Sequence, residues 1–238
     1  MKHRHIVLLL DAPLMSFGSE AVDAHAFVRD FPARSALTGL LANALGWERS
    51  DARALDGLQD RLIFGAARLE DGLRMKDFQT AKLSVNDRGW TTHGSPEGRT
   101  GSPATYQSPH IRHRYVDAQA RVVVVLRLAE AASEPDLDQI SSALDRPARP
   151  LFIGRKPFIP STRLLQGNIF AADVANALGH AIAMFGKAHA YAQWPVAEGG
   201  KCDATTVELT DERNWRAGVH AGIRRVNEGL LDAMSLPA

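Results

Sequence analysis

Apolar positions in the first part of the chain switch between strand-like and helix-like spacing. Residues 5–10 (HIVLLL) form a near-continuous apolar run, which predicts a strand buried on both faces. Leucine and alanine then recur at helical spacing from Ser35, the expected N-cap, to Gly46, the expected stop. A shorter helix is expected over residues 51–60, where leucines again follow one side. Each helix must therefore bury one face.

The middle of the chain predicts further strands and another helix. Residues 62–69 (LIFGAARL) have strand character, and Asp71-Gly72 predicts a hairpin-type turn that leads back through residues 73–78. Residues 121–128 (RVVVVLRL) give the strongest strand signal, because consecutive valines are poor in helices and good in strands. A serine and a proline then open a helix that extends to about residue 144.

The order of these elements predicts the fold class. Strand, helix, strand, hairpin strand, strong strand and helix are followed by an apolar run at residues 151–153, the expected last strand. This order is typical of an α+β fold of the ferredoxin-like or RRM-like type, an antiparallel sheet with two helices on one face. We expect this domain over residues 1–160 and a small C-terminal extension, 161–238, packed on it. In the extension, residues 172–185 are a candidate helix and 205–210 a candidate strand.

A long polar segment interrupts the pattern between Gln79 and Pro109. It is rich in glycine, proline, serine and threonine and has almost no aliphatic residues, yet it keeps cationic and aromatic side chains. Such a long insertion is uncommon inside a compact domain and is either functional or disordered. Its composition leaves both alternatives open.

Composition limits the compartment and the chemistry. With 238 residues, 45% of them hydrophobic and 23% charged, the chain has the composition of an ordinary globular protein. No apolar run could cross a membrane, and the apolar patch before Asp11 is too short for a signal-peptide core. The single cysteine, Cys202, gives neither an internal disulfide nor a metal-ligand pattern. We therefore expect a cytoplasmic protein without metal or cofactor.

Charge is balanced over the whole chain but clustered locally. The net charge of +1 argues against a protein that coats nucleic acid through a global positive field. Cations nevertheless gather at residues 110–114 (HIRHR), at Arg155 with Lys156, and at residues 224–225. Next to Arg155, Gly154 would let another backbone approach closely while the two cations neutralise its charge.

The amino end of the best helix is a second candidate for anion binding. Arg34 and Ser35 lie where free backbone N–H groups and the helix dipole favour a negative charge. The alternative is an ordinary cap with a solvated arginine.

Motifs of common enzyme classes are absent from the sequence, which has no P-loop, dinucleotide glycine pattern, HExxH or GxSxG. A metal-independent ribonuclease needs only a base, an acid and a cation near the scissile phosphate. Tyr106, His110 and His113 beside Arg112 and Arg114 could supply these groups. The alternative is that these side chains bind phosphate or face water.

Five segments in a fixed order carry a resemblance to a known family. They are DAPLMSFG (11–18), DFPARSALTGLLANALGW (30–47), DFQTA (77–81), RYVDAQARVVVVL (114–126) and RPARPLFIGRKPFIPSTRLLQG (146–167). Together they resemble the CRISPR-associated CasD family, the fifth Cas family, in its type I-E form. The C-terminal TDERNWRAGVHAGIRRVNEG is also similar to segments of this family.

The resemblance implies a fold and a role. The fold would be an RRM-like domain of the repeat-associated RNA-binding superfamily (RAMP), with a long hairpin "thumb" at about residues 78–112. Members cap the 5′ handle of the CRISPR RNA (crRNA) in the prokaryotic Cascade complex, beside the backbone subunit CasC and the large subunit CasA. Target DNA would be met only through the complex, and the subunit would be non-catalytic. The alternative is an endoribonuclease that processes precursor crRNA, as in type I-C relatives.

The resemblance also assigns residues. The P-x-R-S element falls on Pro32, Arg34 and Ser35, the L-G-R-[RK] element on residues 153–156, and an aromatic-glycine pair on Phe17 and Gly18. Other cations are added because they flank the thumb or the start of the helix. The expected RNA-binding residues are Phe17, Gly18, Arg29, Arg34, Ser35, His110, Arg112, Arg114, Gly154, Arg155 and Lys156, and the expected thumb residues are Gln79, Lys82, Arg88, Trp90 and Arg99.

Overall fold

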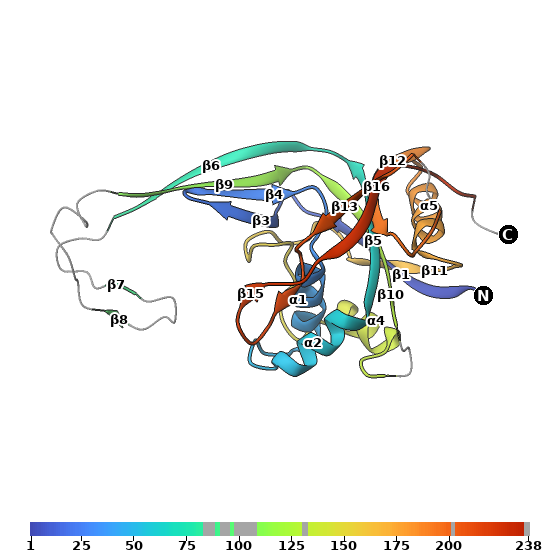
Figure 1. Ribbon diagram of the computed structural model, residues 1–238, viewed down its shortest axis with the longest axis horizontal. Helices are drawn as coiled ribbons and strands as arrows, with labels where there is room; N and C mark the ends of the chain where they lie inside the picture. The colour runs from blue at the N-terminus through green and yellow to red at the C-terminus, as the bar shows by residue number, and fades with distance from the viewer. Residues whose placement is uncertain (83–88, 91–95, 98–108, 130–132, 201–202, 236–238) are drawn as a thin grey trace.

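The computed structural model describes residues 1–82, 89–90, 96–97, 109–129, 133–200 and 203–235 (Figure 1). A long arm extends from a body of helices and sheet, and the N-terminus lies on the side of the body away from the arm (Figure 1). Within the described ranges, no helix has both the length and the apolar character needed to cross a membrane.

A seven-stranded antiparallel sheet forms the body. Its strands in spatial order are β11 (Leu165–Ala171), β1 (His3–Asp11), β10 (Arg121–Leu128), β5 (Leu62–Glu70), β12 (His189–Pro195), β16 (Arg224–Asp232) and β13 (Thr205–Leu209). The apolar runs of β1 and β10 lie next to each other in the middle of this sheet, with Leu8 opposite Val124. Both residues are fully buried, as expected of strands covered on both faces.

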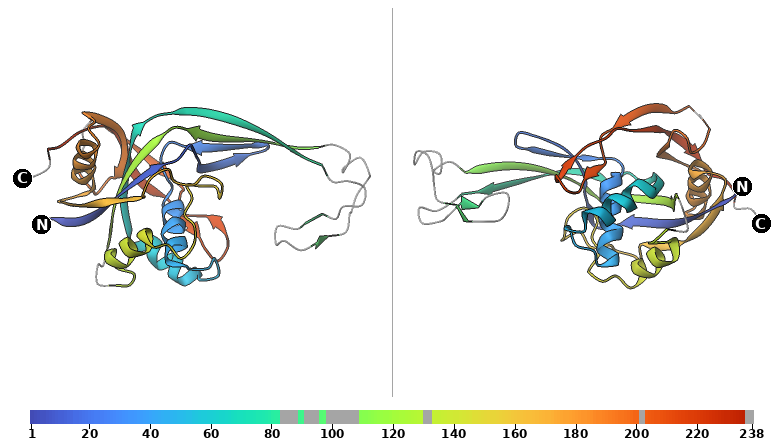
Figure 2. Two further views of the ribbon diagram at one scale, coloured as in Figure 1. Left: turned by 180° about the vertical axis from the view of Figure 1, so that it is seen from behind. Right: turned by 60° about the horizontal axis from the view of Figure 1, so that its bottom comes forward.

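Helices cover both faces of the sheet (Figure 2). On one face, α1 (Arg34–Leu45), α2 (Ala52–Arg61) and α4 (Leu137–Asp145) share a core with Leu8 of β1, and on the other α5 (Val174–Met184) shares a core with Val7. Strands β1, β5, β10 and β11 with α1 and α4 reproduce the predicted order of elements, so the ferredoxin-like, RRM-like fold is confirmed. Helix α5 closes the face that the two predicted helices leave open.

Two local predictions near α1 and α4 are wrong. The apolar run at residues 151–153 forms no strand, because the flanking prolines cannot donate to a sheet; the fourth strand is β11 instead. Ser35 is not the N-cap of α1, since the helix begins one residue earlier and Ala33 holds the cap position without a side-chain hydrogen bond. The predicted stop at Gly46 is confirmed by its left-handed φ of 83°.

The arm continues two neighbouring strands of the central sheet. β6 (Leu73–Ala81) does not fold back on β5; it pairs along its whole length with β9 (His110–Ala118), while β5 pairs with β10. Asp71-Gly72 is therefore a corner and the predicted hairpin turn is wrong. Gly72 has a φ of +66°, and a Cβ there would lie 2.2 Å from the Ala118 carbonyl oxygen. We call β5–β6 with β9–β10 the ribbon (Figure 1).

A buried carboxylate fixes the bend of the ribbon. Asp117, 1% exposed, accepts hydrogen bonds from Arg74 Nε at 2.9 Å and Arg74 Nη2 at 3.1 Å. Arg68 donates to the same carboxylate at 3.4 Å and to the Asp30 carbonyl oxygen at 2.8 Å. These contacts link β5, β6 and β9 at the point where the arm leaves the body.

Short strands complete the arm. β2 (Leu14–Met15) and β4 (His25–Arg29) pair with the second edge of β9, and β3 (Phe17–Val22) pairs with β4. β7 (Gly89–Trp90) pairs with β8 (Pro96–Glu97) farther along the arm. The pairing of β6 with β9 gives the arm the hairpin form expected of the thumb.

The C-terminal third joins the central sheet. The predicted helix and strand are confirmed as α5 and β13, and the small hairpin of β14 (Arg213–Asn214) and β15 (Val219–His220) lies beside α1 (Figure 1). The central sheet crosses the expected boundary at residue 160, since β11 forms one of its edges. The division into 1–160 and 161–238 stays a prediction.

Candidate functional site

One face of the arm gathers cations that the sequence predicted. In the register of β6 and β9, Gln79 is opposite Arg112 and Asp77 is opposite Arg114, so the four side chains share what we call the basic face. Both arginines are exposed. The residues lining a groove at this end of the arm are Gln79, Thr80, Ala81, Lys82, His110, Arg112 and Arg114.

A loop from a distant part of the chain lies next to the basic face. Arg155 donates from Nη2 to the Tyr115 carbonyl oxygen at 3.2 Å, and its guanidinium carbon lies 5.5 Å from the centroid of the Phe158 ring. Partial burial, followed by the charge of Arg114, lowers the pKa of Arg155, while Asp77 acts in the opposite direction. Lys156 is exposed. Among the described residues, neither Arg114 nor Lys156 has an ion-pair partner.

Gly154 is required by a contact inside the protein. Its φ is +88°, and a Cβ there would lie 1.8 Å from the Ser16 carbonyl oxygen. Hydrogen bonds from Ile153 N to the Phe158 carbonyl oxygen at 2.8 Å and from Phe158 N to the Arg155 carbonyl oxygen at 2.9 Å close the loop. The close approach expected at this glycine therefore exists, and the approaching backbone is the protein's own.

The amino end of α1 is already occupied by a carboxylate. The backbone N–H of Arg34 donates to Asp211 Oδ2 at 3.1 Å, and that of Ser35 donates to the Asp211 carbonyl oxygen, also at 3.1 Å. Arg34 Nη1 donates to Glu212 Oε1 at 2.5 Å, and burial lowers the pKa of Arg34. Arg29 Nη2 contacts the Thr210 carbonyl oxygen at 3.2 Å. The expectation that the N–H groups at this helix terminus are free for an anion is thus wrong, although RNA contact by Arg34 and Ser35 stays a prediction.

The occupying carboxylate is itself paired. Arg224 donates to Asp211 at 2.6 Å and 3.1 Å, and both side chains are at most 6% exposed. The Arg224 guanidinium carbon also lies 4.7 Å from the centroid of the Phe64 ring. Asp211 is 177 residues from Arg34, so no local pattern could indicate this contact.

The aromatic ring of the aromatic-glycine pair is not available to RNA. Phe17 is 2% exposed and lies in the core beneath the central sheet, so its assignment as an RNA-binding residue is corrected. Gly18 is exposed, and a Cβ there would meet nothing within 4 Å. No close approach requires a glycine at that position.

Some predicted thumb residues lie outside the described residues. Arg88 and Arg99 belong to this group, and for Trp90 only the backbone is described, as part of β7. Tyr106, a candidate of the ribonuclease alternative, also lies outside the described residues. Gln79 and Lys82 lie on or next to β6, at the groove.

The ribonuclease alternative placed two histidines together on β9. His110 and His113 are three residues apart on one strand, so their side chains point to opposite faces of the arm. The structure therefore separates these two candidate catalytic groups.

Sequence reasoning missed a group of rings on the other face of the arm. His25, Phe27, Phe78, His113 and Tyr115 contact one another across β4, β6 and β9. Rings two residues apart, at 25 and 27 and again at 113 and 115, were a strand-like signal in the sequence. Their meeting depends on the parallel pairing of β4 with β9, which no short motif indicates.

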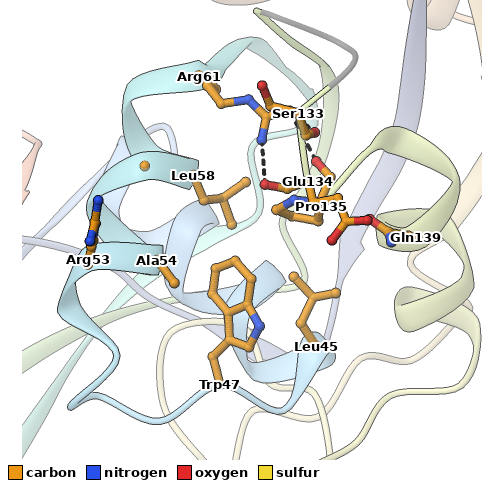
Figure 3. Close-up of a pocket in the computed structure, with 11 residues that line it drawn as sticks. Leu45, Trp47, Arg53, Ala54, Leu58, Arg61, Ser133, Glu134, Pro135 and Gln139 are labelled. Atoms are coloured by element: carbon orange, nitrogen blue, oxygen red, sulfur yellow. Dashed lines mark hydrogen bonds between the residues drawn. The ribbon is translucent and has the colours of Figure 1, made fainter.

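A hollow of another kind lies between α2 and the turn before α4 (Figure 3). Trp47 and Leu58 form part of its apolar wall. Arg61 donates to the carbonyl oxygens of Ser133 at 2.6 Å and Glu134 at 2.9 Å, so its guanidinium holds the turn on α2. Across the described part of the chain, no cluster of three histidine, cysteine or acidic side chains is placed to hold a metal ion.

The fold and the basic arm define the class: an RRM-like protein whose long ribbon carries cations. The chain matches the family model for CRISPR-associated protein (Cas_Cas5) over residues 5–227 and belongs to that family, which confirms the family expected from the sequence. The type I-E form stays a prediction. A comparison with curated proteins gives no match.

Solved structures show the same fold. A chain of a "CRISPR RNA-guided surveillance complex" is similar with a TM-score of 0.67 and 21% identity, over 96% of this chain and 90% of that chain. A "Crystal structure of Cas protein" is similar with a TM-score of 0.59 and 21% identity, over 96% of this chain and 95% of that chain. At this identity the likeness concerns the fold.

Proposed function

We propose that the protein is the subunit of a CRISPR surveillance complex, of the Cascade type, that binds and caps the 5′ handle of the crRNA. The observation that carries the proposal is the meeting of two cations from distant segments. Arg155 of the loop contacts β9 beside Arg114 of the arm, and neither arginine has an ion-pair partner among the described residues. Membership of the Cas_Cas5 family and the likeness to a chain of a surveillance complex support it.

The chemistry of the basic face suits a short single strand. An unpaired RNA handle presents phosphates and 2′-OH groups, and a few local cations can hold it without a globally positive protein. Arg114 and Lys156 are exposed and would neutralise phosphates, while Arg155, half-buried and bonded to the backbone of β9, would hold a fixed position. The net charge of +1 is then no obstacle.

The rest of the proposed assembly follows the family. CasC would lie beside the thumb and CasA nearby, in a type I-E complex, and target DNA would be reached only through that complex. The subunit itself would catalyse no reaction.

Binding of a repeat-derived 5′-handle RNA, followed as a function of salt, tests the proposal. Replacing Arg112, Arg114 and Lys156 together by alanine should weaken binding and reduce the slope of log K against log salt by about 2, since each lost phosphate contact is worth about 0.7 for a single strand. Arg53→Ala, an exposed arginine on α2, is the matched control. Unchanged affinity and slope in the triple variant would refute the proposed site.

The endoribonuclease alternative rests on one observation. Although His110 and His113 are apart, Tyr115 Oη lies 3.5 Å from His25 Nδ1, and the His25 and His113 rings stack 4.6 Å apart. Purified protein incubated with repeat RNA in the presence of a chelator decides between the two functions. Cleavage at the base of the repeat hairpin, lost in His25→Ala, would favour the enzyme; handle binding without cleavage favours the capping subunit.

A further inference from the structure

The usual base-stacking surface of an RRM-like fold is closed in this protein. RRM domains bind single-stranded RNA by stacking bases on aromatic side chains of an open sheet face. Here α1, α2 and α4 cover one face of the central sheet and α5 covers the other. An open sheet with aromatic side chains occurs instead at the base of the arm, where β6, β9 and β4 lie side by side (Figures 1 and 2).

Strand register places these side chains in two rows across the three strands. Phe78 is opposite His113 in the antiparallel pair, and His113 is opposite His25 in the parallel pair. The first row is therefore Phe78, His113 and His25. The second row, two residues farther along β9, is Lys76, Tyr115 and Phe27. We call these six side chains the aromatic face.

The rings form a continuous array with open surface. His25 and His113 stack with centroids 4.6 Å apart and planes 20° apart, and Phe27 and Tyr115 stack at 5.1 Å and 20°. Phe78 is tilted against His113 at 5.3 Å. Phe27 is 44% exposed and Phe78 57% exposed, so each end of the array is open to a ligand.

The electrostatics of the aromatic face suit a polyanion. Lys76 is exposed, lies opposite Tyr115, and has no ion-pair partner among the described residues. Partial burial, with contributions from His25 and Lys76, lowers the pKa of His113, so its imidazole is a neutral ring at physiological pH. The adjacent carboxylate on β9, Asp117, is neutralised by Arg68 and Arg74.

We propose that the aromatic face is a second nucleic-acid site, which binds a short run of unpaired nucleotides by stacking their bases and holding a phosphate with Lys76. It lies on the face of the arm opposite Arg112 and Arg114, so it is separate from the proposed handle site. The composition of the two rows favours bases over a protein partner, because the rows contain no aliphatic side chain. Of the large exposed aliphatic side chains on β6 and β9, Leu73 and Met75 lie on the basic side, and Ile111, 40% exposed, lies on the aromatic side outside the two rows.

The site is tested best in a chain that lacks the handle contacts. In the full-length Arg112→Ala, Arg114→Ala, Lys156→Ala variant, we would measure binding of fluorescent ten-nucleotide oligouridylate and oligothymidylate by anisotropy. Adding Phe27→Ala and Phe78→Ala should weaken binding at least fivefold, because base–aromatic stacking is worth about 1–3 kcal/mol per base. Adding Leu73→Ala and Met75→Ala instead should change little, since these residues lie on the other face of the ribbon with similar exposure.

Competition and the choice of oligonucleotide separate this site from the handle site and show whether its ligand is RNA or DNA. In the otherwise unchanged protein, saturating handle RNA should leave oligonucleotide binding in place. Tighter binding of the ribonucleotide would indicate contact with 2′-OH groups and an RNA ligand, and equal or tighter binding of the deoxyribonucleotide would indicate a DNA strand. If Phe27→Ala and Phe78→Ala leave oligonucleotide binding unchanged, or if handle RNA competes fully with the oligonucleotide, the proposal is overturned and the capping function stays intact. Loss of a protein subunit from the assembled complex in the phenylalanine variant, with oligonucleotide binding unchanged, would also overturn the proposal.

Discussion

The carboxylate of Asp211 joins three parts of the chain that are far apart in sequence. It accepts two hydrogen bonds from Arg224 of β16 and one from the first amide of α1. Its side chain is 1% exposed and that of Arg224 is 6% exposed, so solvent screens this ion pair very little. Asp211→Asn keeps the shape of the side chain and one oxygen acceptor but removes the charge.

The expected cost follows from the charge left behind. Breaking a buried ion pair from one side leaves an uncompensated charge and typically costs about 3–5 kcal/mol. This cost of about 3–5 kcal/mol already includes the lost charge-assisted hydrogen bonds. Weakening of the α1 cap adds about 1 kcal/mol or less, because the asparagine side-chain oxygen still accepts a hydrogen bond from the Arg34 N–H. We expect Asp211→Asn to lower the free energy of unfolding by about 3–5 kcal/mol, a large share of the total of a typical domain.

Equilibrium unfolding in urea, followed by circular dichroism, measures this loss as a lower midpoint. The matched control is Asp145→Asn, because Arg163 donates to Asp145 at 2.7 Å and 2.5 Å in the same two-bond geometry. That pair is 62% and 37% exposed, and ion pairs in such positions contribute little. Its midpoint should therefore stay close to that of the unchanged protein.

A double variant separates the charge from the shape. Asp211→Asn with Arg224→Met removes both charges, so it should lose less stability than the sum of the two single variants. The reasoning is refuted if Asp211→Asn shifts the midpoint no more than Asp145→Asn does, or if the double variant equals the sum.

Three further outcomes are expected. Gly154→Ala should be strongly destabilising because its Cβ would lie 1.8 Å from the Ser16 carbonyl oxygen, whereas Gly18→Ala, with nothing within 4 Å, should leave the melting temperature nearly unchanged; equal effects would contradict the structure. Phe17→Ala should cost about 3–5 kcal/mol in urea unfolding, as for a core ring, and a stable variant with weaker RNA binding would restore the RNA-binding role. Burial lowers the pKa of His5 below its ordinary value of about 6.5, so the unfolded chain binds the proton more readily; stability should fall as the pH drops from about 7 toward 5, and His5→Gln should flatten that loss.

The sequence predicted those elements whose signals are local. The four valines of β10, the apolar run of β1 and the glycine stop of α1 each depend on residues close in the chain, and each prediction agrees with the structure. The prediction failed where pairing partners decide the structure. Asp71-Gly72 has the composition of a hairpin turn, yet β6 pairs with β9 because β5 is already paired on both edges, with β10 and β12.

The candidate site shows the same limit. Arg112 and Arg114 were predicted as a cationic cluster, and the structure brings them to the loop of Arg155. The role expected of Arg34 depended on an empty helix terminus, and Asp211 fills it from 177 residues away. Only tertiary structure reveals such a partner, since one aspartate among many carries no distinctive signal.

The ribbon also has a mechanical consequence. The strands β6 and β9 of the arm continue β5 and β10, which are neighbours in the interior of the central sheet. The arm therefore joins the body at two corners, residues 71–72 and 119–120. Asp117, paired with Arg68 and Arg74, stabilises this junction from inside. A force that a partner applies to the tip of the arm would therefore act directly on β5 and β10 in the interior of the central sheet. An arm attached through a flexible loop would not transmit that force.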